Sequence, residues 1–403
     1  MKEQPTLNTE QSKPTLPAFI FNRFEFAGAL GDLGTMLPLV IALIIINGMN
    51  AVNVLIPIGV FYMISGLYFK VTCPVQPMKI ISAYAIAMGL TPLQITSASL
   101  WMGIFTLLLG ITGLIHLIGR YTPTSTVRGV QLAGGILLMI KGVQFIIQPD
   151  SNLVVQAVAS INVGIIIGII GIVITFILLD NRKIPAAVIV VFGGILAGLF
   201  MGKPLKADDI QVGFYLPSFM PYGIPSWSDL LLIVPIVVLP QIPMTIGNAC
   251  IAQVDTTRQL FGNRAEKMSY RSISNSQGIA NILAFFFGGI PMCHGAGGAA
   301  AHYFFGARTG GANLMIGTIF VVLGVFFGKS AMALFGLLPG AVLGVLLFFA
   351  GSQLAIMIQD LKDKKEIFVA VTMLGITLAS NLAVAFICGL ILAHALKTQK
   401  IKL

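Results

Sequence analysis

Two stretches of the chain place polar or basic side chains, prolines and glycines inside otherwise apolar sequence. The first is VTCPVQPMK at 71–79, and the second is GGIPMCHGAGG at 288–298. Lys79 ends the first stretch, and a lysine inside a membrane segment is costly unless it faces a cavity or a partner. In the second, His294 precedes glycines that let backbone amides approach a ligand closely, as phosphate-binding loops do. Both patterns favour binding of an anion.

The prolines of these stretches indicate where helices resume. Pro77 suits the first turn of a helix, where its missing N–H costs nothing. A helix that begins inside the membrane offers unpaired amides and a positive dipole end to an anion. Close helix packing is the alternative explanation for the glycines, and snorkelling to the membrane surface is the alternative for Lys79.

Neutral polar residues elsewhere in apolar runs are expected to complete the site, since a buried polar side chain needs a partner. Gln241 lies between Pro240 and Pro243 in LPQIPMTIGN, which predicts an irregular eighth span facing the site. Contact between helices explains these neutral residues equally well. The expected substrate-binding residues are Gln76, Lys79, Gln241, Thr245, Asn248, His294, Gly295, Gly297 and Gly298.

One acidic residue falls well inside an apolar run. Asp32 lies in the sequence GDLGT, whose glycines allow close helix approach. It is a candidate for binding a coupling proton or a cation such as sodium, and a fixed salt bridge to Lys79 explains it equally well. Thr35 and His302 are assigned, with Asp32, to coupling or to structure.

The histidines and cysteines do not form a metal-binding or catalytic pattern. His302 follows His294 by eight positions, which is not a zinc-ligand spacing, and no acid lies between them. The four cysteines lack paired spacing, so we interpret them as free thiols. Cys293 has no orienting acid or base nearby of the kind that a nucleophile needs. We therefore expect no metal, no cofactor and no enzymatic activity.

Membrane helices must position these residues. Of the 403 residues, 57% are apolar and 9% are charged, whereas a soluble domain averages about 25% charged residues. Apolar runs of roughly 20 residues match a hydrocarbon layer of about 30 Å. A membrane β-barrel is excluded because runs such as VGIIIGIIGIVITFILL do not alternate in polarity. The sequence predicts an all-α polytopic membrane protein.

About fourteen transmembrane segments are expected from the apolar runs. They begin near residues 24, 52, 74, 95, 127, 161, 184, 229, 272, 293, 311, 332, 366 and 382. The resulting regions are a cytoplasmic N-terminal tail (1–23), a first seven-segment repeat (24–202), an extracytoplasmic linker (203–228), a second repeat (229–396) and a cytoplasmic tail (397–403).

The basic residues predict the orientation of these spans. Lysines and arginines concentrate in cytoplasmic loops. With the N-terminus inside, only Lys203, Lys206 and Lys329 fall on the outer side. Both termini are then cytoplasmic, in a protein of the inner (plasma) membrane. The formal charge of +10 reflects this orientation and gives no indication of nucleic-acid binding.

The two interruptions fall in the third and tenth spans, which we expect to be discontinuous helices. Seven spans in each half is an odd number, so the second half enters the membrane from the opposite side and forms an inverted repeat of the first. Paired discontinuous helices with their N-termini near the midplane are typical of secondary transporters of anionic substrates.

Three motifs resemble the molybdate-transporter family, which is related to the sulfate permeases. They are GALGDLGTMLPL at 28–39, PVQPMK at 74–79 and PMCHGAGGAAAHYFFGARTGG at 291–311. The resemblance implies a substrate-binding core domain, made of spans one to four and eight to eleven, that moves against a gate domain. It implies a tetrahedral oxyanion as substrate, with molybdate ahead of sulfate. Homodimers are common in the resembled fold, and we expect no counterpart of the C-terminal regulatory domain that sulfate permeases usually carry.

Two other function classes remain as alternatives. A nucleobase-type permease of the same architecture would be expected to place carboxylates in the eighth and tenth spans, where this chain has Gln241 and His294. A membrane-embedded enzyme would need an orienting acid or base near Cys293 or the histidines. The sequence therefore favours a secondary active anion transporter, a symporter if Asp32 carries the coupling ion.

Overall fold

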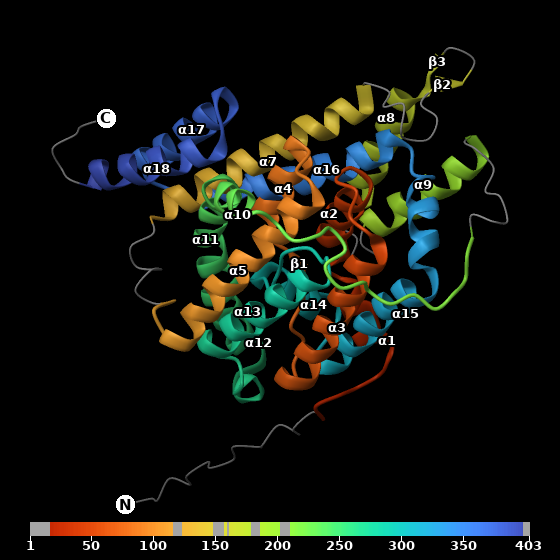
Figure 1. Cartoon of the computed structure of the whole chain (residues 1–403), viewed down its shortest axis with the longest axis horizontal. Coiled ribbons are helices and arrows are strands. Elements are labelled where there is room, and N and C mark those ends of the chain that lie inside the picture. The colour runs from red at the N-terminus through yellow and green to blue at the C-terminus, as the bar shows by residue number, and fades with distance from the viewer. Residues whose placement is uncertain are drawn as a thin grey trace, which may run out of the picture.

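The computed structural model describes residues 17–115, 123–147, 157–158, 161–178, 186–201 and 210–397. Helices dominate these residues, and two short pairs of strands interrupt them (Figure 1). Six described helices are long and apolar enough to cross a membrane, or up to seven if the bent pair α1 and α2 forms one span. The prediction of a polytopic helical membrane protein is therefore confirmed. The ends of the expected tails and part of the linker, at 1–16, 398–403 and 202–209, lie outside the described residues.

The elements follow the predicted order of apolar runs. The first half contains α1 (Arg23–Leu30), α2 (Leu33–Ile45), α3 (Ala51–Phe69), β1 (Gln76–Pro77), α4 (Lys79–Met88), α5 (Pro92–Thr112), α7 (Thr124–Ile147), β2 (Ala157–Val158), β3 (Ile161–Asn162), α8 (Val163–Leu178) and α9 (Ala186–Met201). The second half contains α10 (Trp227–Ile233), η2 (Val234–Val238), α11 (Leu239–Met244), η3 (Thr245–Ala252), α12 (Gln253–Phe261), η4 (Gly262–Ala265), α13 (Tyr270–Phe286), β4 (Met292–Cys293), α14 (Ala296–Phe305), α15 (Gly310–Phe335), α16 (Gly340–Ala355), η5 (Ile356–Asp360), α17 (Lys364–Ala379) and α18 (Leu382–Lys397).

Local sequence sets where the helices around the site begin and end. The Asn50 side chain caps α3 by accepting hydrogen bonds from the amides of Val52 and Asn53. Thr91 and Gln94 form a capping box at the start of α5, with proline at the first helical position. The short helix α4 ends at Gly89, whose φ of 67° suits the left-handed region.

Both expected interruptions are present as extended chain that leads into a short helix. The chain is non-helical from Lys70 to Met78 before α4, and from Phe287 to Gly295 before α14. The two segments pair through β1 and β4, which are antiparallel, with Gln76 opposite Cys293 and Pro77 opposite Met292. Because the pairing satisfies backbone groups that no helix satisfies, non-helical chain can exist deep within the bundle.

Glycines bring the long helices together in pairs. A Cβ at Gly59 of α3 would lie 2.6 Å from the carbonyl oxygen of Gly317 in α15, and one at Gly142 of α7 would lie 2.5 Å from that of Gly344 in α16. In the same way, Gly103 brings α5 against α13. Small residues at such crossings allow helix backbones to approach closely in a membrane.

The helices form two groups with α2 between them. The first group is α3, α5, α13 and α15, and the second is α7, α16, α17 and α18, which run together across the upper part of Figure 1. Helix α2 contacts β1, α4 and α16, and its residues Ile41 and Leu43 are completely buried. The crossing of β1 and β4 therefore lies in the interior.

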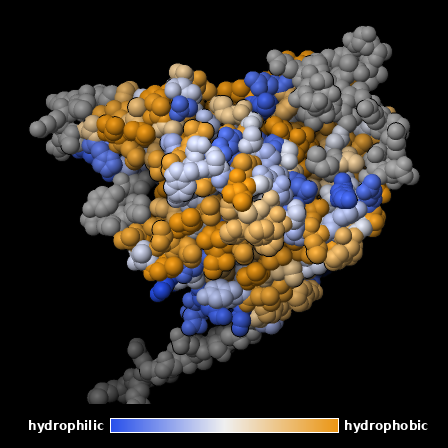
Figure 2. Space-filling model, in the orientation of Figure 1, coloured by the Kyte–Doolittle hydropathy of each residue, from blue (hydrophilic) through white to orange (hydrophobic). Residues whose placement is uncertain are grey.

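The outer surface is apolar, as a lipid-facing surface should be. Large apolar side chains such as Ile177, Phe200 and Ile391 are 75%, 89% and 66% exposed. Figure 2 shows wide apolar areas on one face of the molecule, with hydrophilic residues in smaller groups near its edges. A soluble protein rarely exposes apolar area this extensive.

The structure confirms one detail of the spans and corrects another. The eighth span is irregular as predicted, because π-helical η2 and η3 flank the proline-containing α11. The expected start of the twelfth span near residue 332 is wrong, since α15 continues to Phe335 and α16 begins at Gly340. The helix tolerates its polar residue Ser330 because the side chain bonds to the backbone of Gln211.

Candidate functional site

The crossing of β1 and β4 brings the N-termini of two short helices into the interior. Helix α4 begins two residues after Pro77, and α14 begins three residues after Cys293. The amide of Met78 also donates to the carbonyl of Pro291 at 2.8 Å, which extends the pairing toward α4. Because helix N-termini carry unpaired amides and a positive dipole end, this arrangement concentrates positive potential in the interior.

The N-terminus of α14 leaves its first amides without partners. No side chain caps the helix at Gly295, and the amides of Ala296, Gly297 and Gly298 have no acceptor among the described residues. Gly297 is exposed, and a Cβ built on it would meet no atom within 4 Å. The first turn of α14 is therefore accessible at Gly297, where nothing stands in the place of a side chain.

The other two glycines of this turn serve internal packing. A Cβ at Gly298 would lie 2.7 Å from both Asp32 Oδ2 and Gln76 Nε2, and one at Gly295 would lie 2.5 Å from Gln76 Oε1. Only glycine allows Asp32 and Gln76 to approach the start of α14 this closely. A larger residue at either position would displace these two side chains.

The N-terminus of α4 is capped by a side chain from the eighth span. Gln241 Oε1 accepts hydrogen bonds from the amides of Ile80 at 3.0 Å and Ile81 at 3.3 Å. Its Nε2 donates to Thr245 Oγ1 at 3.0 Å, and both side chains are buried. The predicted residues Gln241 and Thr245 thus lie at the site, where they fix the eighth span against α4.

Asp32 is held by neutral donors. Gln76 Nε2 donates to its two carboxylate oxygens at 2.6 and 2.7 Å, and Thr35 Oγ1 donates to Oδ1 at 2.7 Å. The carboxylate is 3% exposed, and such charge-assisted bonds make its burial tolerable. Gln76 Oε1 is itself buried without a partner among the described residues.

Lys79 does not form the fixed salt bridge that the sequence left open. It is the first residue of α4 and is half-buried, and it interacts electrostatically with Asp32 without bonding to it. Within the described ranges the one ion pair joins Arg128 to Asp360, far from the site in sequence. Gln76 donates to both oxygens of Asp32, and the Lys79 ammonium has no hydrogen-bond partner in the described part of the chain.

Asn248 lies beside the open end of α14. Its Nδ2 would lie 3.6 Å from a Cβ at Gly295, and its side chain is half-buried with no hydrogen bond among the described residues. An amide in this position can donate to a ligand at the start of α14. Lys79, Asn248 and Gly297 are therefore three of the predicted residues that keep donor groups free near the crossing, together with the amide of Gly298.

The two histidines brace the extended chain before α4. His294 Nδ1 lies 2.8 Å from the carbonyl oxygen of Pro74, and its Nε2 lies 3.2 Å from Ser276 Oγ. His302 Nδ1 lies 2.6 Å from Thr72 Oγ1, while its buried Nε2 has no partner in the described part. In this arrangement both nitrogens of His294 are engaged with protein atoms.

Two buried asparagines that the sequence analysis missed support the same segments. Asn313 binds both the amide and the carbonyl of Cys73, and Asn281 binds both the amide and the carbonyl of Met292. Asn313 thus satisfies the backbone of the extended segment before β1, and Asn281 satisfies that of β4 itself. The rule that a buried amide in an apolar span needs a partner would have identified both residues.

Metal binding finds no support in the geometry. Over the described ranges no group of three or more histidine, cysteine or acidic side chains is arranged to hold a metal ion. Cys73, Cys250 and Cys293 are buried free thiols, and Cys388 is a half-buried one. The chemistry of the site is that of backbone amides, one ammonium group and neutral side chains around a buried carboxylate.

Comparison with known families and proteins places this geometry in context. The family model described as "Molybdate transporter of MFS superfamily" matches residues 24–138 and 235–354. Molybdate transporter 2 of Arabidopsis thaliana is 30% identical over 93% of this chain and 87% of its own length. Molybdate transporter 1 of the same plant is 31% identical over 91% of this chain and 86% of its own length.

Two solved structures with a similar fold carry titles that name a bicarbonate transporter and an anion transporter. The transmembrane domain of the cyanobacterium bicarbonate transporter BicA aligns with a TM-score of 0.63 and 17% identity, covering 93% of this chain and 98% of that domain. Murine solute carrier 26 family member A9 aligns with a TM-score of 0.66 and 15% identity, covering 96% of this chain and 70% of that protein. At this identity the likeness concerns the fold alone.

The Asp32 cluster can be tested through stability. Gln76→Leu should destabilise the purified protein in detergent, because each lost hydrogen bond to a charged group is worth about 1.5–3 kcal/mol. In an Asp32→Asn protein, Gln76→Leu should lower the free energy of unfolding by less, since residue 32 then carries no charge that the change would leave unpaired. Thermal or chemical unfolding of the wild-type protein, the two single variants and the double variant forms a double-mutant cycle, which should give a coupling energy of about 0.5–3 kcal/mol between Gln76 and Asp32. Equal costs in both backgrounds would show that Gln76 does not stabilise the carboxylate.

Proposed function

Because the chain belongs to the molybdate-transporter family, we propose that it is a secondary active transporter that carries molybdate across the membrane by alternating access. The observation that carries this proposal is the open first turn of α14, whose free amides lie at the crossing beside Lys79 and Asn248. Sulfate and other tetrahedral dianions share the charge and shape of molybdate, and they are the next candidates.

The charges near the crossing suit a dianion. Each helix N-terminus contributes roughly half a positive charge, so α4 and α14 together with Lys79 supply about two. Ala296, Gly297 and Gly298 would donate backbone hydrogen bonds, and Asn248 would donate from its side chain. Gln241 and Thr245 would set the position of α4, and Gln76, His294 and Gly295 would hold the two extended segments in place.

The buried carboxylate of Asp32 suggests how transport is coupled. Its Oδ2 lies next to the start of α14, so an ionised Asp32 would repel a dianion bound there. A proton or a sodium ion that neutralises Asp32 would remove this repulsion, which makes binding of the coupling ion and of the substrate mutually favourable. Thr35, which bonds to Asp32, and His302 would act through their support of this region.

An arrangement of fourteen segments in two inverted repeats is also proposed. Its support is the pairing of α3 with α15 and of α5 with α13. Helices α3 and α15 are spans two and eleven, and α5 and α13 are spans four and nine. Under the proposed symmetry span two corresponds to span nine and span eleven to span four, so each of these helix pairs is the counterpart of the other. The strands β1 and β4 belong to spans three and ten, which correspond to each other under this symmetry, and the two strands pair with each other. Spans one to four and eight to eleven would form the core domain, with the remaining spans as the gate.

The concentration of basic residues supports an inner-membrane location with both termini in the cytoplasm. Single cysteines in a protein lacking Cys388 test this orientation, because the other three cysteines are buried. Ile224→Cys, at a position 82% exposed in the linker, should react with an impermeant thiol reagent from outside intact cells. Lys362→Cys should react only after permeabilisation. Labelling of both positions from the same side would contradict the proposed repeats.

A nucleobase permease is the second candidate. The nucleobase transporter PlAzg2 of Paenibacillus larvae is 24% identical over 66% of this chain and 52% of its own length. Recognition of ring N–H groups calls for carboxylates in the eighth and tenth spans, and Gln241 and His294 stand there instead. The similarity to transporters also argues against an enzyme.

Uptake into proteoliposomes distinguishes these candidates. Purified protein should accumulate molybdate, and unlabelled tungstate and sulfate should compete more strongly than phosphate, bicarbonate or uracil. A protein that accumulates uracil and ignores molybdate would refute the proposal.

Removal of the Lys79 charge should weaken binding of the dianion. In Lys79→Gln the dissociation constant for molybdate should rise about tenfold or more, because a hydrogen bond to a charged group contributes about 1.5–3 kcal/mol. Lys362→Gln is the matched control, since Lys362 is exposed in the loop before α17. Calorimetry on purified proteins gives both affinities. Wild-type affinity in Lys79→Gln would show that the anion binds elsewhere.

Neutralising Asp32 should separate binding from coupling. Asp32→Asn should still bind and exchange molybdate, because the repelling charge is gone, but it should no longer concentrate molybdate in response to an ion gradient. Uptake is measured with an imposed proton gradient, with an imposed sodium gradient and without either. If the variant still responds to the gradient that drives the wild-type protein, Asp32 does not bind the coupling ion.

A further inference from the structure

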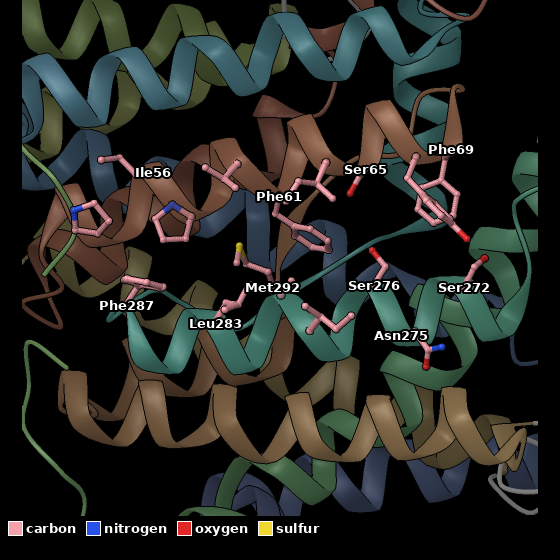
Figure 3. A pocket seen from close by; sticks show the side chains of 17 residues that line it. Ile56, Phe61, Ser65, Phe69, Ser272, Asn275, Ser276, Leu283, Phe287 and Met292 are labelled. Atoms are coloured by element: carbon pink, nitrogen blue, oxygen red, sulfur yellow. The ribbon is translucent and has the colours of Figure 1, made fainter. Parts of the chain in front are cut away.

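A groove of about 460 Å³ runs along the outer surface between α3 and α13. Figure 3 shows side chains from α3 above and α13 below that point into the space between the two helices. Ile56 and Phe287 lie at one end, and Phe69 and Ser272 lie at the other. This volume falls within the usual range for binding sites of small ligands.

The groove changes in polarity along its length. Around Ile56, Leu283 and Phe287 its walls are apolar, whereas Ser65, Ser272 and Ser276 line the other half. Ser65 is 1% exposed, and its hydroxyl has no hydrogen-bond partner among the described residues. A buried hydroxyl without a partner needs an explanation, and a ligand group in the groove that accepts a hydrogen bond would supply one.

Positive charge gathers at the serine end. Lys70 directly follows the last residue of α3, and Arg271 directly precedes Ser272; both side chains are exposed. The ammonium of Lys267 lies 5.1 Å from the centre of the Tyr68 ring, and Tyr68 lines the groove. Of the acidic residues on the same segment, Asp255 accepts a bond from the Tyr270 hydroxyl, and Glu266 is exposed next to Lys267.

We propose that this groove binds an anionic phospholipid, with one acyl chain between α3 and α13 and its phosphate beside Lys70, Lys267 and Arg271. The polarity along the groove matches the successive parts of a phospholipid. The acyl chain would lie along the apolar half, an ester carbonyl would accept a hydrogen bond from Ser65, and the negative headgroup would lie at the basic end. In the orientation proposed above this end faces the cytoplasmic leaflet, whose anionic lipids attract basic residues close to the membrane.

The groove also touches the segment that leads to α14. Phe61 and Met292 form part of its wall, and the Phe61 ring centre lies 4.8 Å from that of His294. The hydroxyl of Ser276, a residue that lines the groove, lies 3.2 Å from His294 Nε2. A bound acyl chain would therefore pack against residues that fix the extended segment before α14, and its removal would loosen that segment.

Lipid binding can be measured on the purified, delipidated full-length protein by native mass spectrometry. The protein should bind phosphatidylglycerol at least about tenfold more tightly than phosphatidylcholine, since each basic side chain near an anionic headgroup contributes about a fivefold gain. A variant with both Lys267→Gln and Arg271→Gln should show an affinity ratio of phosphatidylglycerol to phosphatidylcholine that is lower by about tenfold or more. The control is combined Lys362→Gln and Lys364→Gln, at exposed positions before and at the start of α17, which should leave the preference unchanged.

Filling the groove tests the position of the acyl chain. Ile64 lines the groove and is 53% exposed, so Ile64→Trp should block it and lower retention of phosphatidylglycerol. Ile391→Trp on the outer face of α18 is the matched control. Glycerol phosphate without acyl chains should neither bind tightly nor displace the lipid. The proposal would be overturned if the protein bound the two lipids with equal affinity, or if the two tryptophan variants retained phosphatidylglycerol equally. It would also be overturned if a second copy of the chain buried the groove in a dimer.

Discussion

The antiparallel pairing of β1 with β4 is the interaction on which the rest of the molecule depends. Gln76 and Pro77 lie opposite Cys293 and Met292, where the long helices leave chain that is not helical. In hydrocarbon each unpaired backbone group costs several kcal/mol, so this chain is stable only because strand pairing and buried asparagines satisfy it. The same pairing fixes the starts of α4 and α14 near one another. A pair of strands with only two residues each thus places two helix N-termini in the interior.

The crossing explains why so many polar side chains are buried around it. Asn313 satisfies the backbone of the segment before β1, and Asn281 satisfies that of β4. His294 connects β4 to the segment before β1. Gln241 caps α4, whereas the start of α14 is left open. Under the proposed function, this difference between the two helix ends would direct an anion toward α14. It also assigns most of the polar residues to holding the backbone rather than to contact with a ligand.

Asp32 gives the site its electrostatic character. Two hydrogen bonds from Gln76 and one from Thr35 hold a carboxylate next to a helix N-terminus, where the dipole favours negative charge. A bound dianion would compete with that carboxylate for the same positive potential. Under the proposed mechanism this competition is the source of coupling, because neutralisation of one negative group favours binding of the other.

Much of the fold followed from the sequence, because membrane spans are set by apolar length and discontinuous helices by proline and glycine. The breaks at 71–79 and 288–298, and the irregular eighth span, were predictable for this reason. The partners of individual side chains were not, since they depend on how distant helices pack. An ion pair with Lys79 and a role in coupling were equal alternatives for Asp32, and only the structure shows that Gln76 donates to both of its oxygens. Gly297 and Gly298 looked equivalent, yet only Gly297 faces open space.

The most direct test of the account is to locate a heavy oxyanion in the structure. Tungstate has the shape and charge of molybdate and scatters strongly, so a crystal or cryo-electron microscopy structure of the protein with tungstate would show its position. The account predicts one tungstate at the first turn of α14, contacting the amides of Ala296 to Gly298, with the Lys79 ammonium and the Asn248 amide beside it. An empty crossing, with tungstate bound only at exposed lysines or elsewhere in the bundle, would contradict it.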